Sequence, residues 1–368
     1  MMDGLKKKSI FIKGIVIFIL LSVGINVGIL VWTTDKDTWL QMSQFRWQFI
    51  PILLALGALR WYLDAMSFVT MAKYGTEKSL SLQRATAIRL EGTLLASIVP
   101  FLVGTFSMHG YLLHKEKLKI SESVAITFLR AVLPVFIFLF NIPILLFMDS
   151  DPNRNQLFSK FLEAVSLPVV VIIVFMVITL FYPHQIKKGA SAFIRWWGRI
   201  KFMHVEKVIS IEERLFLEID QFSKIFWTYL RKKKYMLIQA LLWILSAFVV
   251  DYILAIAIIW GFGFSPDFQH ALILQFLMRP IIFFAITPGG AGIWDFTYLG
   301  FYSLFLPQSL IGVAVLLWRI LMTYFPCMIG AAYLTRDFHR DQLLRESLLE
   351  KGVLPDDGTA KKNPSGSM

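Results

Sequence analysis

Nine ionisable side chains interrupt long apolar stretches of this sequence, where a charge is costly to bury. Each costs about 2.5–3.5 kcal/mol at the centre of a membrane-spanning helix, so such residues face the protein interior, form pairs and often mark a pathway. Four are arginines whose planar guanidinium groups suit a phosphate headgroup: Arg130, Arg319, Arg279 and Arg89. The other five are expected to form charge pairs or to carry protons: Arg60, Asp64, Glu91, Asp251 and Asp295.

The arginines Arg130 and Arg319 lie at matching places in the two halves of the chain. Two guanidinium groups near the middle of a membrane would make a bidentate site for phosphate. We favour this function over the alternative that they hold nearby backbone carbonyl groups in place. For Arg279 and Arg89, contact with a substrate and support of the local backbone are equally favoured.

The acidic residues allow less specific predictions. Asp64 follows Arg60 by four residues, so the two share one helix face, and a structural clamp is the preferred interpretation. Asp64, Asp251 and Asp295 could carry protons or serve as counter-ions, and the sequence does not distinguish these roles. The sequence has no Walker A motif and no His/Cys cluster with metal-ligand spacing, so we expect no cofactor, no metal and no recognisable catalytic centre.

The composition indicates that these charges lie in a membrane. The 368 residues are 57% apolar, with a mean hydropathy of +0.63, whereas a soluble domain is about 45–50% apolar. The excess forms stretches near the length of about 20 residues that spans hydrocarbon as a helix. We expect them at 10–32, 49–72, 85–113, 124–147, 167–182, 235–260, 270–306 and 310–334. The net charge of +12 comes largely from basic loops between these stretches, which favours membrane orientation over nucleic-acid binding.

Two of the stretches carry helix-breaking residues near their middle. If the basic loops on both sides of 85–113 are cytoplasmic, its 29 residues are too few for two crossings, and a re-entrant hairpin results. The same logic applies to 270–306, and the alternative is two ordinary crossings with one misplaced basic loop. The predicted hairpin tips are Pro100, Gly104, Pro288, Gly289, Gly290 and Gly292.

The two halves also share a pattern of charges and breaks. Intervals of 36 and 30 residues separate Asp64, Pro100 and Arg130. Intervals of 37 and 31 residues separate Asp251, Pro288 and Arg319. This match predicts inverted-topology repeats at about 47–147 and 235–334, an architecture of many transporters. We therefore expect an all-α polytopic membrane protein with about six full transmembrane helices, two re-entrant hairpins, and cytoplasmic N and C termini.

The remaining segments are polar. Residues 184–234 hold twelve Lys/Arg against five Asp/Glu, and an apolar face recurs within them at spacings of three and four. We expect this cytoplasmic segment to lie on lipid headgroups or on the bundle, with partner docking as the alternative. The transmembrane domain is predicted to cover 1–336, and 337–368 to be a charged cytoplasmic tail with a disordered end.

The run Pro288-Gly289-Gly290-Ala291-Gly292-Ile293-Trp294-Asp295, followed by Leu317-Trp318-Arg319 and Gly330, resembles a known family. It looks like the lysylphosphatidylglycerol synthase transmembrane region, the flippase-like part of the bacterial multiple peptide resistance factor. The run from Pro100 through Gly104 to Gly110-Tyr111-Leu112-Leu113 matches less specifically. Asp295 stands where the family usually has Glu, and Thr105 departs from its first-hairpin pattern. No soluble aminoacyl-transferase domain is expected after Arg336, so the resemblance implies lipid handling without the synthase reaction.

We therefore expect a lipid translocase, flippase- or scramblase-like, that moves a phospholipid or a polyprenyl-phosphate-linked lipid between leaflets of the cell membrane. The expected partners are membrane lipids, and no nucleic acid. A homo-oligomer or a cytoplasmic glycosyltransferase partner stays open. The alternative functions are a lipid-modifying membrane transferase and a membrane scaffold for a cytoplasmic glycosyltransferase.

Overall fold

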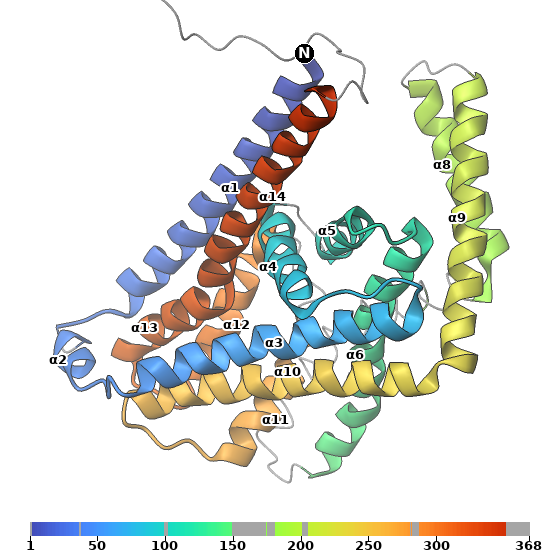
Figure 1. The fold of residues 1–368 in the computed structure, drawn as a ribbon. Coiled ribbons are helices and arrows are strands. Elements are labelled where there is room, and N and C mark those ends of the chain that lie inside the picture. Colours follow the sequence, from blue (N-terminus) through green and yellow to red (C-terminus); the bar gives the residue numbers. More distant parts are fainter. Residues whose placement is uncertain are drawn as a thin grey trace, which may run out of the picture.

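The computed structural model describes residues 2–36, 38–98, 102–148, 174, 181–200, 205–279, 281 and 287–350. Every regular element in these ranges is helical, which confirms the all-α prediction (Figure 1). The elements are α1 (Met2–Thr33), α2 (Thr38–Ser43), α3 (Phe49–Gly75), α4 (Leu82–Ile98), α5 (Leu102–Lys115), α6 (Ile120–Met148), α8 (Pro183–Ile200), α9 (Val205–Lys232), α10 (Lys234–Gly261), α11 (Phe268–Met278), η2 (Pro288–Gly290), α12 (Ile293–Tyr302), α13 (Gln308–Arg319), η3 (Ile320–Tyr324) and α14 (Phe325–Glu350).

Four apolar helices in the described ranges are long enough to cross a membrane: Lys13–Thr33, Phe49–Gly75, Lys234–Gly261 and Gln308–Arg340. They match four of the predicted stretches and support the membrane class. The count of about six crossings stays a prediction, because 167–182 lies mostly outside the described residues. No helix break occurs at the predicted boundary between 336 and 337, since α14 continues to Glu350.

The helices α3 and α10 pack side by side along their length and run antiparallel (Figure 1). At one end the Tyr229 hydroxyl, just before α10, donates to the Gly75 carbonyl at 2.9 Å. At the other end the Arg46 amide, just before α3, donates to the Gly261 carbonyl at 2.8 Å. The repeats themselves stay a prediction, but opposite directions are what inversion requires of these two corresponding helices.

The helices α4 and α5 form a hairpin. Arg84 in the first turn of α4 lies 2.5 Å from Glu116 just after α5 (Nε to Oε1). The start of α4 and the end of α5, which are the outer ends of the pair, therefore meet. The helices have 17 and 14 residues, hence lengths of about 26 and 21 Å, which is short of a hydrocarbon core of about 30 Å. The predicted tip residue Pro100 lies outside the described residues, and Gly104 lies in the first turn of α5.

A second pair, α11 and α12, also has its outer ends together. The rings of His270 and Phe305 are 5.9 Å apart between centroids. The break ahead of α12 contains Gly289, Gly290 and Gly292 at φ angles of 60°, 63° and 86°. Only glycine adopts this left-handed region without strain, which explains the glycine-rich run.

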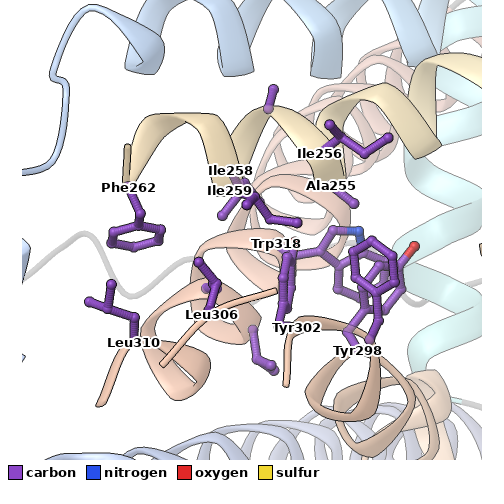
Figure 2. Packing of buried hydrophobic residues seen from close by; sticks show 14 of the residues in the cluster. Ala255, Ile256, Ile258, Ile259, Phe262, Tyr298, Tyr302, Leu306, Leu310 and Trp318 are labelled. Atoms are coloured by element: carbon purple, nitrogen blue, oxygen red, sulfur yellow. The ribbon is translucent and has the colours of Figure 1, made fainter. Parts of the chain in front are cut away.

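An aromatic cluster fixes this second pair against α10 and α13. Tyr298 of α12 stacks on Trp318 of α13 at 3.7 Å between ring centroids, with Tyr302 beside them (Figure 2). Ile259 of α10 and Phe262, just after α10, belong to the same buried cluster. Arg319 is the last residue of α13, and the helix continues through the π-helical turn η3, an irregularity common at functional sites.

Helix α9 is only partly packed on the bundle. Phe222, Phe226 and Tyr229 of its C-terminal half are buried together with residues of α6 and α10. Ile211 and Leu215, on the same predicted apolar face, are exposed. Among the described residues, the half of this face that is nearer to α10 is therefore the better covered one.

Candidate functional site

Asp64 on α3 is the centre of a buried charge network. Its Oδ2 accepts a hydrogen bond from Arg89 Nε on α4, and its Oδ1 accepts one from Arg130 Nη2 on α6 at 2.6 Å. Arg60, one turn earlier on α3, lies 3.5 Å away (Nη1 to Oδ2). One carboxylate thus joins arginines from three helices.

The network continues to Asp251 on α10. Arg279, which follows α11, donates from Nη1 to Asp251 Oδ2 at 3.0 Å. Arg60 Nε lies 3.9 Å from the same oxygen, so Arg60 links the two carboxylates. Four guanidinium groups therefore meet two carboxylates in this part of the described chain, which leaves an excess of two positive charges.

The side chain of Arg130 contacts three residues of α3. Besides Asp64 it binds the Ser67 hydroxyl (Nε to Oγ, 2.7 Å), and its guanidinium carbon lies 3.4 Å from the ring centroid of Phe68. These three partners recur at spacings of three and four on one face of α3. The contacts make Arg130 a tie between α6 and α3.

Arg279 differs because it borders a cavity. The cavity is lined by Tyr252, Gln275, Met278, Arg279, Trp294, Thr297 and Tyr298, and has room for about one water molecule. The Tyr252 hydroxyl and Gln275 Oε1 are buried without a hydrogen-bond partner among the described residues. Buried polar atoms without partners are costly, so this cavity favours a polar occupant.

Arg319 belongs to a separate network, although the sequence pairs it with Arg130. Its Nε lies 3.5 Å from Asp295 Oδ1, and its Nη2 donates to the Gly289 carbonyl at 3.1 Å. Arg319 and Asp295 are both fully buried. Asp295 Oδ2 in turn accepts from the Gly292 amide at 2.8 Å, so the pair holds the glycine-rich break.

Helix α1 completes this second network. Asn26 Nδ2 donates to Asp295 Oδ1 at 3.0 Å, and the hydroxyl groups of Ser22 and Tyr324 are 2.9 Å apart. Arg319 Nη2 lies 3.4 Å from Ser22 Oγ. Sequence analysis missed these partners because they are uncharged, and Ser22 and Asn26 lie outside both predicted repeats. The available signal was their separation by four residues on one face of an apolar helix.

Glu91 lies in a third cluster, near the outer ends of α4 and α5. Arg84 Nη1 is 3.0 Å from Glu91 Oε1, and Arg84 Nη2 is 2.6 Å from Asp337 Oδ2 on α14. Glu116 binds the same guanidinium. This position makes Glu91 part of a three-helix junction that does not share a partner with the central network.

The two breaks approach one another. A side chain added at Gly289 would overlap the Phe18 ring and lie 3.4 Å from Ser97 Cβ, near the end of α4. Ser97 also contacts Cys327 of α14 (Oγ to Sγ, 3.6 Å). Pro288 and Gly289 therefore lie beside the end of α4 that leads to the first break. The described ranges hold no group of three or more His, Cys, Asp or Glu arranged for a metal ion.

Comparison with known proteins gives the family. The family model of the lysylphosphatidylglycerol synthase TM region matches residues 15–330. The chain belongs to this family. An UPF0104 membrane protein of Archaeoglobus fulgidus is 20% identical over 340 residues, which are 90% of this chain and 99% of the relative. No solved structure matches the chain.

Membership in the lysylphosphatidylglycerol synthase TM region family confirms the resemblance seen in the sequence and, with the four apolar helices, a membrane protein. The matched range ends at Gly330, so it includes all three charge clusters except Asp337 of the third cluster. The central network and the Arg319–Asp295 network both lie within it.

Proposed function

We propose that this protein moves a lipid with a phosphate-containing headgroup, either a phospholipid or a polyprenyl-phosphate-linked lipid, between the leaflets of the cell membrane. The observation that carries the proposal is the excess of two positive charges in the largely buried network of Asp64 and Asp251. An uncompensated buried charge is expensive, and an anionic headgroup would offset it.

Arg279 is the proposed first contact for the headgroup. It is the arginine of the central network that borders the polar cavity, which Trp294 and Tyr298 also line. Its guanidinium can bind phosphate through two hydrogen bonds. In the described conformation its Nη1 donates to Asp251 instead. The cavity is far smaller than the roughly 300–1,000 Å³ of common ligand sites, so the described conformation is closed.

Opening requires the two helical pairs to move. We propose that α4–α5 and α11–α12 are re-entrant hairpins, because the outer ends of each pair meet and α4 and α5 are short. Their displacement from α3 and α10 would enlarge the cavity while the lipid tails stay in the bilayer. Arg319, Asp295 and α1 would keep the second break in shape during this movement.

A liposome assay tests the proposal. Purified protein is reconstituted in liposomes with fluorescent phosphatidylglycerol, phosphatidylcholine or a polyprenyl phosphate. The fluorophore exposed on the outer surface is then reduced chemically, and the loss of fluorescence is followed over time. We expect Arg279→Ala to slow transport at least about tenfold, the effect of losing about 1.4 kcal/mol of headgroup binding. Arg279→Lys keeps the charge but loses the bidentate geometry, so it should be intermediate. Arg336→Ala, an exposed arginine on α14, is the matched control.

Two further variants separate the roles of the other arginines. Arg130→Ala and Arg319→Ala remove ties inside the protein, so they should reduce thermal stability as well as transport. Wild-type transport by Arg279→Ala would overturn its headgroup role. No movement of any lipid by the wild-type protein would overturn the translocase itself, and new lipid products in mass spectrometry would instead support a transferase.

A further inference from the structure

The end of α3 and the turn from α9 to α10 meet at one end of the antiparallel pair. The Tyr229 hydroxyl donates to the Gly75 carbonyl at 2.9 Å, and Lys233 Nζ donates to the Tyr74 carbonyl. Figure 1 shows this turn beside the end of α3. The two segments, although far apart in the sequence, therefore share one surface.

This surface concentrates positive charge. Six basic residues lie on it, and we call them the basic corner: Lys73, Lys78, Arg231, Lys232, Lys233 and Lys234. All of them except Lys233 are exposed. Residues 73–78 and 231–235 contain one acidic residue, Glu77, so six positive charges and one negative charge leave a net charge of +5 on the two segments.

The described part of the chain does not neutralise these charges. Within it, the basic corner contacts aromatic rings and one carbonyl group, and none of its side chains forms an ion pair. Lys73 Nζ, for example, lies 5.1 Å from the centroid of the Tyr74 ring. Lys234 also begins α10, where the helix dipole disfavours a positive charge. An anionic partner at this surface would offset the repulsion among the six residues.

The position of the basic corner indicates which anion it meets. Helices α3 and α10 are apolar and long enough to cross a membrane, and the corner lies where α3 ends and α10 begins. Tyr74 and Tyr235 are 40% and 72% exposed there, and tyrosine is enriched at the level of the lipid headgroups. Clusters of about four to eight Lys/Arg directly beside a membrane-spanning helix are typical of anionic-lipid binding.

We infer that the basic corner binds anionic lipid headgroups of the leaflet at which α3 ends and α10 begins. The attraction comes from several flexible side chains, so it selects anionic lipids over zwitterionic lipids. The surface is separate from the cavity at Arg279. Asp251, the partner of Arg279, lies 17 residues (251 − 234) along α10 from Lys234, hence about 25 Å away. The inference holds whether or not the protein moves lipid.

Quenching of a fluorophore by labelled lipids tests this inference. In a Cys327→Ser background, the fluorophore is attached at Tyr235→Cys beside the basic corner. The control position is Leu40→Cys on α2, which is 66% exposed and lies just before the other end of α3. The full-length protein is reconstituted in phosphatidylcholine liposomes. A trace of phosphatidylglycerol or of phosphatidylcholine, each with a quencher on its acyl chain, then reports how strongly each lipid gathers near the fluorophore.

Two charge variants show whether the basic corner causes the gathering. The test variant removes four of its exposed charges and keeps Lys233, which binds the Tyr74 carbonyl. The control variant removes four exposed charges elsewhere, so both variants change the net charge equally. All eight positions are exposed, and both variants are therefore expected to fold. The test changes are Lys73→Gln, Arg231→Gln, Lys232→Gln and Lys234→Gln, and the control changes are Lys36→Gln, Lys188→Gln, Arg214→Gln and Arg336→Gln.

At low salt the fluorophore at 235 should be quenched at least about threefold more strongly by phosphatidylglycerol than by phosphatidylcholine. The test variant should lose this preference, as should the wild type at high salt, and the control variant should keep it. Equal quenching by the two lipids at 235 would overturn the inference, as would the same preference at position 40 or an equal loss in both variants. Displacement of phosphatidylglycerol by inorganic phosphate, but not by chloride at the same ionic strength, would show a site for free phosphate instead.

Discussion

Replacing Asp64 with asparagine should destabilise the protein strongly. The change keeps the volume of the side chain but removes the carboxylate that three arginines share. Asp251 would then be the remaining carboxylate for all four guanidinium groups, and the excess of positive charge would rise from two to three. Removing one partner of a buried ion pair typically costs about 3–5 kcal/mol, and here three pairs lose the same partner.

The lone cysteine of the chain provides the assay. Cys327 is 7% exposed, so a thiol-reactive fluorophore reports unfolding during a thermal ramp in detergent. For a large chain 1 kcal/mol corresponds to about 2 °C, so Asp64→Asn should lower the melting temperature by about 6–10 °C. Asp251→Asn should lower it less, since Asp251 has one arginine at 3.0 Å and one at 3.9 Å.

The control is Glu213→Gln on the exposed face of α9, which changes the net charge of the chain by the same amount. It should melt within about 1 °C of the wild type, as surface substitutions do. A melting temperature of Asp64→Asn within about 2 °C of the wild type would refute the reasoning, because the network would then contribute less than about 1 kcal/mol.

Three further predictions concern other contacts. Gly330→Ala should lower the melting temperature by several degrees because its Cβ would overlap the Leu90 carbonyl of α4, whereas Gly300→Ala, which has open space, should not. Asn26→Leu should cost about 1–3 kcal/mol by removing a donor to the buried Asp295, and an unchanged melting temperature would contradict that contact. The Ser191 hydroxyl and then Arg195 lower the pKa of Glu212. These contacts therefore stabilise the folded protein above the unfolded pKa of Glu212, and this stabilisation is lost as the pH falls through the folded pKa. Hydrogen exchange of α8, corrected for intrinsic rates, should show faster opening in acid. The variant Glu212→Gln should not show this dependence on pH.

The sequence predicts the helices and the charges well, but not which charges meet. Burial cost alone selects Arg60, Asp64 and Asp251, because a charge in an apolar stretch needs a partner wherever it lies. The partner depends on how helices pack, so Arg130 binds Asp64 on α3, whereas Arg319 binds Asp295 on α12. Matched spacing in two repeats cannot foresee this difference, since the two arginines meet different neighbours.

The hairpins and helix α9 show the same limit. Helix breaks follow from Pro and Gly, and the left-handed angle of Gly289 bears this out. The role of α1 does not follow, because Asn26 and Ser22 are ordinary polar residues until the fold places them beside Asp295 and Tyr324. The apolar face of α9 is readable as periodicity, but only the structure shows that Phe222 and Phe226 are buried while Leu215 stays 37% exposed.

The distribution of the central ion pairs over the helices bears on how such a protein could open. Arg60 lies on α3 and reaches both Asp64 on α3 and Asp251 on α10, so these contacts stay within the antiparallel pair. Arg89 lies on α4 and Arg279 follows α11, so their contacts cross from each hairpin to that pair. If the hairpins move as proposed, one guanidinium on each is released towards the headgroup, while Arg60 remains beside both carboxylates. An anionic headgroup would then replace Asp64 and Asp251 as the partner of the released arginines, which lowers the cost of opening when lipid is present and keeps the empty protein closed.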